Sequence, residues 1–211
     1  MRYFKLLLLV LIIPVMGACN RTEMTFNSFS GFTQGTTYSV IYENRKGTEL
    51  TRMRSDIENL LREFDGSLST YNPNSIISAI NDNRDTVPDD FFIKVFNRSR
   101  EIWEMSGGAF DITAGPLVNA WGFGPDALNR FDESKLDSLM DLVGMEKVNL
   151  ENGKIVKSHP GMYLDVNAIA QGYSVDVLSE FLETKGIRNY LLRLVARRAA
   201  GTKAGAETSG K

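Results

Sequence analysis

The chain has 211 residues, of which 43% are hydrophobic and 24% are charged. This length and balance predict a globular protein of one domain with a sizeable core. The formal net charge of −2 argues against a nucleic-acid-binding protein, which usually carries a strongly basic surface.

Residues 1–18 are predicted to be a secretory signal peptide. Arg2 and Lys5 precede an apolar run, residues 6–13, that is too short to span a bilayer comfortably. Small residues then lead to Cys19, the chain's one cysteine, and the sequence MGAC resembles a bacterial lipobox. The resemblance implies a protein lipidated at Cys19 and held in the inner or outer membrane of the cell envelope, facing the periplasm. The alternative is plain secretion with a free thiol.

Residues 19–30 are predicted to be a polar tether, and the folded domain is expected to begin at residue 31. Residues 37–42 alternate in polarity, which predicts a strand with Tyr38, Val40 and Tyr42 on its buried face. Gln34 and Gly35 stand at its entry. Gly35 either lets a ligand approach the backbone closely or marks a β-bulge.

Three helices are predicted in the next part of the chain. The first runs from Thr48 to Phe64 and is expected to break at the Asp65–Gly66 pair. Ser75 is the expected cap of the second, and Asp89 or Asp90 of the third, which ends at a pair of glycines. Tyr71 lies on the loop before the second helix, where it either stacks on a planar ligand or covers the edge of the core.

A glycine-rich passage, residues 106–124, follows the third helix. Residues 110–113 are expected to be extended, and the exposed backbone around them suits contact with a nucleotide. The spacing of a P-loop or of a dinucleotide-binding GxGxxG motif is absent, so a Rossmann-type site is not supported. Beyond it we expect a helix over 133–143 and a hairpin whose turn is Asn152–Gly153. His159 is expected to be a turn residue rather than a general base.

The stretch from Tyr163 to Leu178 is the one around which the predicted site is organised. An apolar strand end leads into Asp165, and Asn167 is expected to cap the helix that follows. The first turn of a helix favours an anion, and small residues there allow close approach. This pattern predicts a site for a phosphate-bearing ligand, in which Asp165 orients a hydroxyl or helps to hold a hard cation. The alternative is an ordinary core helix with a surface acid.

Three separated motifs resemble the FAD:protein FMN transferases, also called the ApbE family. They are FDGSLSTYNPNSIIS (64–78), SGGAFDITAGPLVNAWGFG (106–124) and YLDVNAIAQGYSVD (163–176). The resemblance implies an α+β fold of the T-fold-related kind, with helices packed on a mixed sheet and FAD in a cleft. It also implies a Mg²⁺-dependent enzyme that moves FMN from FAD to a threonine of acceptor flavoproteins in membrane electron-transport complexes. Some members mainly hydrolyse FAD.

The same resemblance assigns site residues. It implies FAD contacts at seven positions and a metal ligand at Ala168, through the carbonyl oxygen because alanine has no side-chain donor. The family's catalytic histidine would lie beyond the last residue of this chain, so no catalytic residue is assigned. The implied FAD contacts are Gln34, Tyr71, Ala109, Phe110, Asp111, Asp165 and Gln171.

Residues 193–211 depart from the family pattern. They carry five basic residues, one acid and few apolar ones, which predicts a disordered, low-complexity tail after an N-terminal part of the transferase domain, residues 31–192. We expect a frame shift or truncation near Leu192, although a natural basic tail that binds anionic lipid is an alternative. The second functional hypothesis is therefore a catalytically inactive, FAD-binding lipoprotein fragment.

Overall fold

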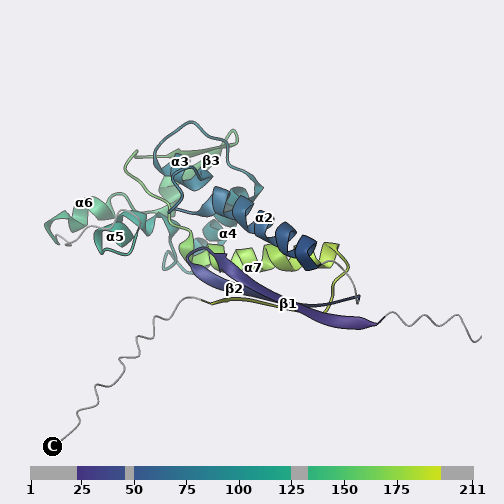
Figure 1. Cartoon of the computed structure of the whole chain (residues 1–211). Helices are drawn as coiled ribbons and strands as arrows, with labels where there is room; N and C mark the ends of the chain where they lie inside the picture. The colour runs from purple at the N-terminus through teal and green to yellow at the C-terminus, as the bar shows by residue number, and fades with distance from the viewer. Residues whose placement is uncertain (1–22, 46–49, 125–132, 196–211) are drawn as a thin grey trace, which may run out of the picture.

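The computed structural model describes residues 23–45, 50–124 and 133–195. One sheet has the strand order β1-β2-β5, formed by Met24–Thr33, Thr36–Arg45 and Tyr190–Val195. Two long helices, α2 (Leu50–Leu68) and α7 (Asn167–Thr184), lie along one face of this sheet (Figure 1). The predicted α+β fold is confirmed.

The remaining elements form a second body beside the sheet. Among them are α3, α4 and a small two-stranded sheet, while α5 and α6 project to one side in Figure 1. Their bounds are α3 Ile76–Asn81, α4 Asp90–Met105, η2 Ile112–Ala114, α5 Gly115–Ala120, η3 Glu133–Lys135, α6 Leu136–Met140, η4 Met145–Lys147, β3 Val148–Glu151 and β4 Lys154–Lys157.

Both sheets are antiparallel throughout the described residues, so the expectation of a mixed sheet is wrong. A two-residue turn joins β1 to β2, and such a turn can connect only antiparallel strands. The chain returns from α7 through residues 185–189 and enters β5 antiparallel to β2, with Val40 opposite Leu192.

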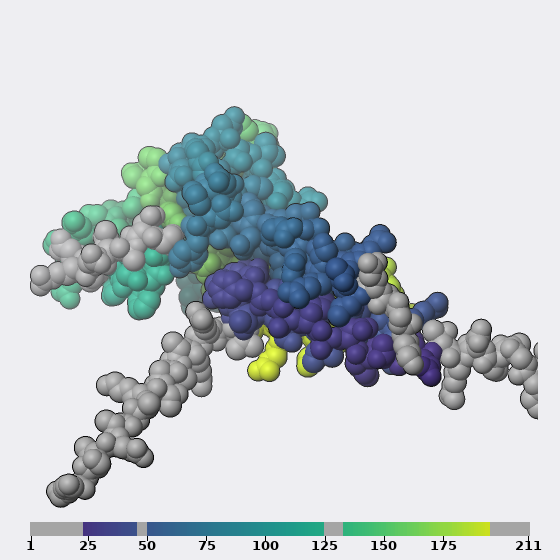
Figure 2. Space-filling view, in the orientation of Figure 1, coloured from purple at the N-terminus to yellow at the C-terminus, as the bar shows by residue number. Residues whose placement is uncertain are grey.

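Residues 24–30 belong to β1 and not to the tether predicted over residues 19–30, because β1 begins at Met24. The strand places Thr25, Asn27, Phe29, Gly31 and Thr33 on the less exposed side, and Phe29 alone is buried. Polar and small residues dominate that side, so the segment lacks the apolar alternation that reveals a strand. Figure 2 shows this strand at the lower border of the molecule, below α2.

Two hydrophobic cores meet along α2 and α7. The sheet core contains Tyr38, Val40 and Tyr42, as predicted, packed on Ile57 of α2 and Leu182 of α7. The other ends of the same helices belong to the core of the second body, through residues that include Phe64, Leu68, Ala170 and Val177. Burying one large apolar side chain contributes about 1.5–3 kcal/mol, so each helix is fixed from both sides. The two cores therefore meet near the middle of α7, between Val177 and Leu178, and the start of α7 belongs to the second body.

Most helix signals are confirmed. Ser75 Oγ accepts a hydrogen bond from the Ser78 N–H at 3.1 Å, and Asp89 caps α4 through the Phe92 N–H at 2.9 Å. The expected break at Asp65–Gly66 is wrong, because α2 continues to Leu68, which is buried with Phe64. The apolar spacing that drives the helix runs across the Asp-Gly pair.

Three further expectations need correction. Residues 112–114 form the 3₁₀ turn η2 rather than an extended piece, and the region 133–143 holds a 3₁₀ turn and one short helix. Residues 162–166 are irregular rather than a strand. The hairpin is confirmed, with positive φ at both Asn152 (50°) and Gly153 (76°).

Residues 193–195 do not belong to the tail predicted over residues 193–211. Arg193, Leu194 and Val195 continue β5, because they pair with β2. Residues 196–211, like the predicted signal peptide and Cys19, lie outside the described residues. In the described part of the chain, none of the helices has the length and apolarity that crossing a membrane requires.

Candidate functional site

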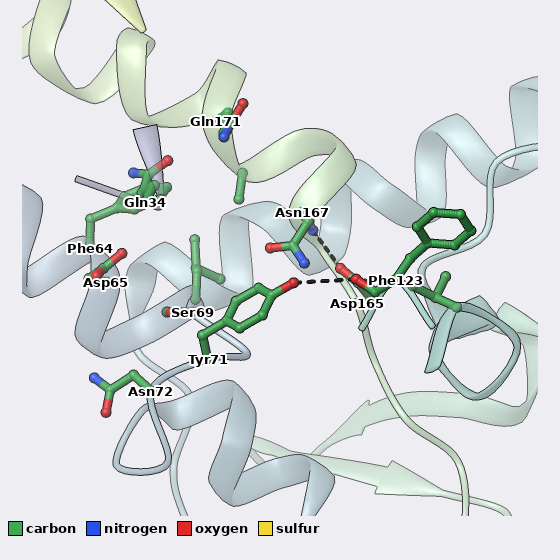
Figure 3. A pocket seen from close by; sticks show the side chains of 14 residues that line it. Gln34, Phe64, Asp65, Ser69, Tyr71, Asn72, Phe123, Asp165, Asn167 and Gln171 are labelled. Carbon is green, nitrogen blue, oxygen red and sulfur yellow. Dashed lines mark hydrogen bonds between the residues drawn. The ribbon is translucent and has the colours of Figure 1, made fainter. Parts of the chain in front are cut away.

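A cavity of about 660 Å³ opens beside the first turn of α7 (Figure 3). Its walls come from the β1–β2 turn, the end of α2 and the loop after it, the end of α5, and α7. Four predicted FAD contacts line it together: Gln34, Tyr71, Asp165 and Gln171. The other lining residues are Gly35, Phe64, Asp65, Leu68, Ser69, Asn72, Val118, Phe123, Asn167 and Ala170.

Gln34 enters the cavity from a strained turn. Gln34 and Gly35 have φ values of 49° and 69° and form the two-residue turn between β1 and β2, so Gly35 marks a turn and not a bulge. A left-handed conformation costs a residue other than glycine about 1 kcal/mol. The side-chain nitrogen Nε2 is buried and has no hydrogen-bond partner within the described residues, whereas Oε1 lies 3.5 Å from Ser174 Oγ. A buried donor without a partner is suited to a ligand.

Asp165 is placed by the backbone on both sides of it. Its N–H donates to the Ile112 carbonyl at 2.7 Å, and its Oδ1 accepts a hydrogen bond from the Asn167 N–H at 2.8 Å. The Asp165 carboxylate therefore accepts the hydrogen bond of the first N–H of α7. The expectation that the Asn167 side chain caps this helix is wrong. Burial raises the pKa of the Asp165 carboxyl above its ordinary value, and the Asn167 hydrogen bond partly offsets this increase.

Two aromatic rings flank the cavity mouth. Tyr71 is 63% exposed and its hydroxyl donates to the Phe123 carbonyl at 3.4 Å, while the Phe123 side chain is 77% exposed. Figure 3 shows Tyr71 directed toward the Phe123 side of the cavity. Exposed rings on a concave surface can stack on a planar ligand, so the ligand-facing interpretation of Tyr71 is favoured over that of a core cover.

The sequence did not reveal the second acid of the site, Asp65. Burial raises the pKa of its carboxyl. We expected Asp65 to end a helix, but it lies in the last turns of α2, next to the buried Phe64. The continuous spacing of Ile57, Leu61, Phe64 and Leu68 was the signal that could have placed it on the cavity side of a longer helix. Phe123 carried no such signal, because it lies in a glycine-rich loop.

The predicted contacts at residues 109–111 do not line this cavity. The half-buried Phe110 packs against the core of the second body, and Ala109 is exposed. Asp111 has a structural role: its carboxylate accepts hydrogen bonds from the Thr113 N–H, the Thr113 hydroxyl and the Met145 N–H at 2.8, 2.6 and 3.1 Å. These bonds join η2 to the start of η4, the 3₁₀ turn that precedes β3. FAD contacts at these three residues stay predictions.

Ala168 lies on the other side of α7 from this cavity. It lines a separate hollow of about 510 Å³ between α4 and α7, together with Lys94 and Tyr173. The residues that the structure describes contain no group of three or more acidic, histidine or cysteine side chains placed to hold a metal ion. His159 Nδ1 accepts a hydrogen bond from the Gly161 N–H at 2.9 Å, which agrees with the expected turn residue.

A model of the ApbE family matches residues 34–206. The chain belongs to the ApbE family. The match begins at the strained Gln34 and extends past Leu192, after which the sequence was expected to depart from the family pattern. The chain is 34% identical over 173 residues to the FAD:protein FMN transferase of Vibrio cholerae, and 32% identical over 191 residues to that of Haemophilus influenzae.

Solved structures of ApbE proteins have the same fold. The flavin transferase ApbE from Vibrio cholerae superposes with a TM-score of 0.76 at 30% identity, covering 81% of this chain and 57% of the other. The flavinyl transferase ApbE of Pseudomonas stutzeri, in its apo form, gives 0.75 at 28% identity, covering 82% and 59%. The two curated relatives are matched over 51% and 55% of their length, with 78% and 85% of this chain aligned. This ApbE-family chain therefore spans about half the length of those relatives.

Proposed function

We propose that the cavity beside α7 binds FAD and that the chain forms the flavin-nucleotide-binding part of an FAD:protein FMN transferase. The observation that carries this proposal is the buried Gln34 Nε2, which has no hydrogen-bond partner in the part of the chain that the structure describes and lies in the same cavity as the Asp165 carboxylate. Membership of the ApbE family and the names of the relatives support the choice of FAD among nucleotides.

In the proposed reaction, a threonine hydroxyl of an acceptor protein attacks the phosphorus on the FMN side of the FAD pyrophosphate. The new bond joins the threonine oxygen to that phosphorus, the bond to the AMP phosphate breaks, and AMP and the hydroxyl proton are released. Phosphoryl transfer depends mainly on positioning and electrostatic stabilisation. Gln34 would donate a hydrogen bond to a ligand oxygen, Asp165 would accept one from a ligand hydroxyl, and Tyr71 would stack on a ring.

The oxygen donors of the cavity fit Mg²⁺ in part. Mg²⁺ is usually held by one or two carboxylates together with substrate phosphates and waters, and both Asp65 and Asp165 line the cavity. We therefore propose Asp165 as the ligand this chain offers to an ion in the cavity, whereas Ala168, which lines the hollow on the other side of α7, stays a separate prediction from the family resemblance. When bound, the ion would neutralise charge on the pyrophosphate.

Incubation with FAD tests the proposed function. The full chain is mixed with FAD and MgCl₂, binding is followed by flavin fluorescence, and AMP and covalently flavinylated acceptor are measured afterwards. Asp165→Ala should weaken FAD binding by about tenfold to a hundredfold, because hydrogen bonds to charged groups contribute about 1.5–3 kcal/mol. Glu180→Ala, an exposed acid later on the same helix, is the matched control and should bind as the unchanged chain does.

The possible outcomes separate the two hypotheses. AMP together with a fluorescent acceptor supports the transferase, and AMP without modified acceptor supports FAD hydrolysis. FAD binding with neither product would leave only the inactive flavin-binding protein. Equal affinity in Asp165→Ala and the unchanged chain would place the flavin elsewhere.

We further propose that Cys19 is lipidated, that the domain faces the periplasm, and that its acceptors are flavoproteins of membrane electron-transport complexes. The basic residues, apolar run and small residues before Cys19 support the first point. A bacterial culture fed labelled palmitate should give labelled protein in the membrane fraction, and Cys19→Ser should abolish the label. Unchanged labelling in that variant would contradict lipidation at Cys19.

A further inference from the structure

A side-chain amide holds the backbone immediately before Asp165 with the two hydrogen bonds that a neighbouring β-strand would make. Asn81, the last residue of α3, is buried, and its amide faces Leu164. Its Nδ2 donates to the Leu164 carbonyl at 3.0 Å, and its Oδ1 accepts a hydrogen bond from the Leu164 N–H at 2.8 Å. Both backbone groups of Leu164 are therefore paired with one side chain 83 residues earlier in the sequence.

A lysine adds two further hydrogen bonds between Asn81 and the segment before Asp165. Lys157, at the end of β4, donates from Nζ to the Asn81 carbonyl at 2.9 Å and to the Met162 carbonyl at 3.0 Å. The half-buried Lys157 thus binds the backbone of Asn81 to the segment that Asn81 also holds through its side chain. We call Asn81 and Lys157, with these four hydrogen bonds, the clamp.

The clamp leaves little freedom to the residue that follows it. Met162 and Leu164 are fully buried, and the Asp165 N–H is taken by the Ile112 carbonyl at 2.7 Å. The backbone is therefore fixed by hydrogen bonds at Met162, Leu164 and Asp165, and these bonds determine where the Asp165 carboxylate enters the cavity. A carboxylate acts on a ligand only when its own position is fixed by the groups behind it.

We propose that Asn81 and Lys157 are positioning residues for FAD binding, which act through Asp165. This inference rests on the proposed function, since it assumes that the cavity binds FAD. Neither residue lines the cavity. Their effect on the ligand must therefore pass through the backbone of residues 162–165.

A double-mutant cycle tests the route of this effect. Asn81→Ala should weaken FAD binding about tenfold, as loss of a supporting residue behind a ligand-contacting group commonly does. In the Asp165→Ala background the same substitution should change the affinity less than twofold, because the group it positions is gone. A merely structural role would weaken binding equally in both backgrounds, and that result would overturn the proposal.

Lys157→Met provides a second variant in case Asn81→Ala fails to fold. It removes two of the four hydrogen bonds and keeps most of the aliphatic stem, so it should give the same dependence on Asp165 with a smaller loss of affinity. Asn83→Gly is the matched control. It removes an amide-to-carbonyl hydrogen bond to Pro160 in the same region, at a residue whose φ of 55° suits glycine, and should leave FAD affinity unchanged.

Amide hydrogen exchange without FAD separates failure of the clamp from failure of the proposed function. The Leu164 amide should be protected in the unchanged chain and should exchange at least tenfold faster in Asn81→Ala. Retained protection would overturn the clamp whatever FAD does. Loss of protection combined with unchanged FAD affinity in Asp165→Ala would instead overturn the proposed function of the cavity, and the positioning role with it.

Discussion

Gln34 combines an unfavourable backbone with a buried polar group, which suggests that its side chain is kept for the ligand. Asn-Gly is the favoured pair for a turn with positive φ at both central residues, and asparagine has the same amide one methylene closer to the backbone. Gln34→Asn should therefore raise the free energy of unfolding by up to about 1 kcal/mol, the approximate cost of the left-handed conformation. It should also weaken FAD binding, because the shorter side chain does not reach as far. Denaturant unfolding and FAD titration measure the two effects, and unchanged affinity would contradict a role for Gln34.

Asp165 gives the stability of the fold a pH dependence of known sign. Burial raises its pKa in the native state, so between the unfolded and folded pKa values the native state binds more protons than the unfolded chain. Its contribution to stability is thus present at low pH and is lost as the pH rises through the folded pKa. Asp165→Asn can still accept the Asn167 hydrogen bond and should be more stable than the unchanged chain at pH 8. The difference should vanish below about pH 4, near the ordinary pKa of aspartate. Thermal melts across this range check it, and a pH-independent difference would contradict it.

Among the elements, η2 and α5 must approach the clamped segment very closely. A Cβ added at Gly115, the first residue of α5, would lie 2.5 Å from Tyr163 Cδ1 and 2.7 Å from its carbonyl oxygen. Gly115→Ala should lower the free energy of unfolding by about 1–3 kcal/mol through overpacking. Gly172→Ala on α7 is the control, since a Cβ there meets nothing within 4 Å, and it should stabilise the helix by about 0.5–1 kcal/mol. Chemical denaturation compares the two, and similar values would contradict the close approach.

The sequence was sufficient to predict a feature where the residues of one helix, strand or turn specify that feature by themselves. The caps of α3 and α4, the Asn152–Gly153 turn and the buried face of β2 all follow from local patterns. Features that depend on contacts between residues far apart in the sequence could not be predicted from local patterns. The partners of β1 lie in β2, and Asn81 appeared as an ordinary helical residue although it holds Leu164. Within the site, Gln34, Tyr71, Asp165 and Gln171 line one cavity and their contacts with FAD stay predictions, whereas the position of Asp65 and Phe123 in the same cavity could be seen only in three dimensions.

At the scale of the whole molecule, the sheet presents large apolar residues on the side away from α2 and α7. Phe26, Phe32 and Leu191 are each more than half exposed among the described residues. An exposed apolar sheet face promotes association. The double substitution Phe26→Ser and Phe32→Ser should reduce concentration-dependent association with little loss of stability, as measured by sedimentation velocity and thermal melts. Phe29→Ser, on the buried side of the same strand, should cost about 3–5 kcal/mol. Association that is equal in the double variant and the unchanged chain would exclude this face as its cause.

The walls of the cavity come from residues 34–35, 64–72, 118–123 and 165–171, which are spread over most of the described sequence. No short fragment of the chain contains them all. A nucleotide that binds only when these stretches are assembled stabilises the complete fold by mass action. Saturating FAD should therefore slow limited digestion by trypsin at sites throughout the domain at once, rather than shielding a single loop from the protease.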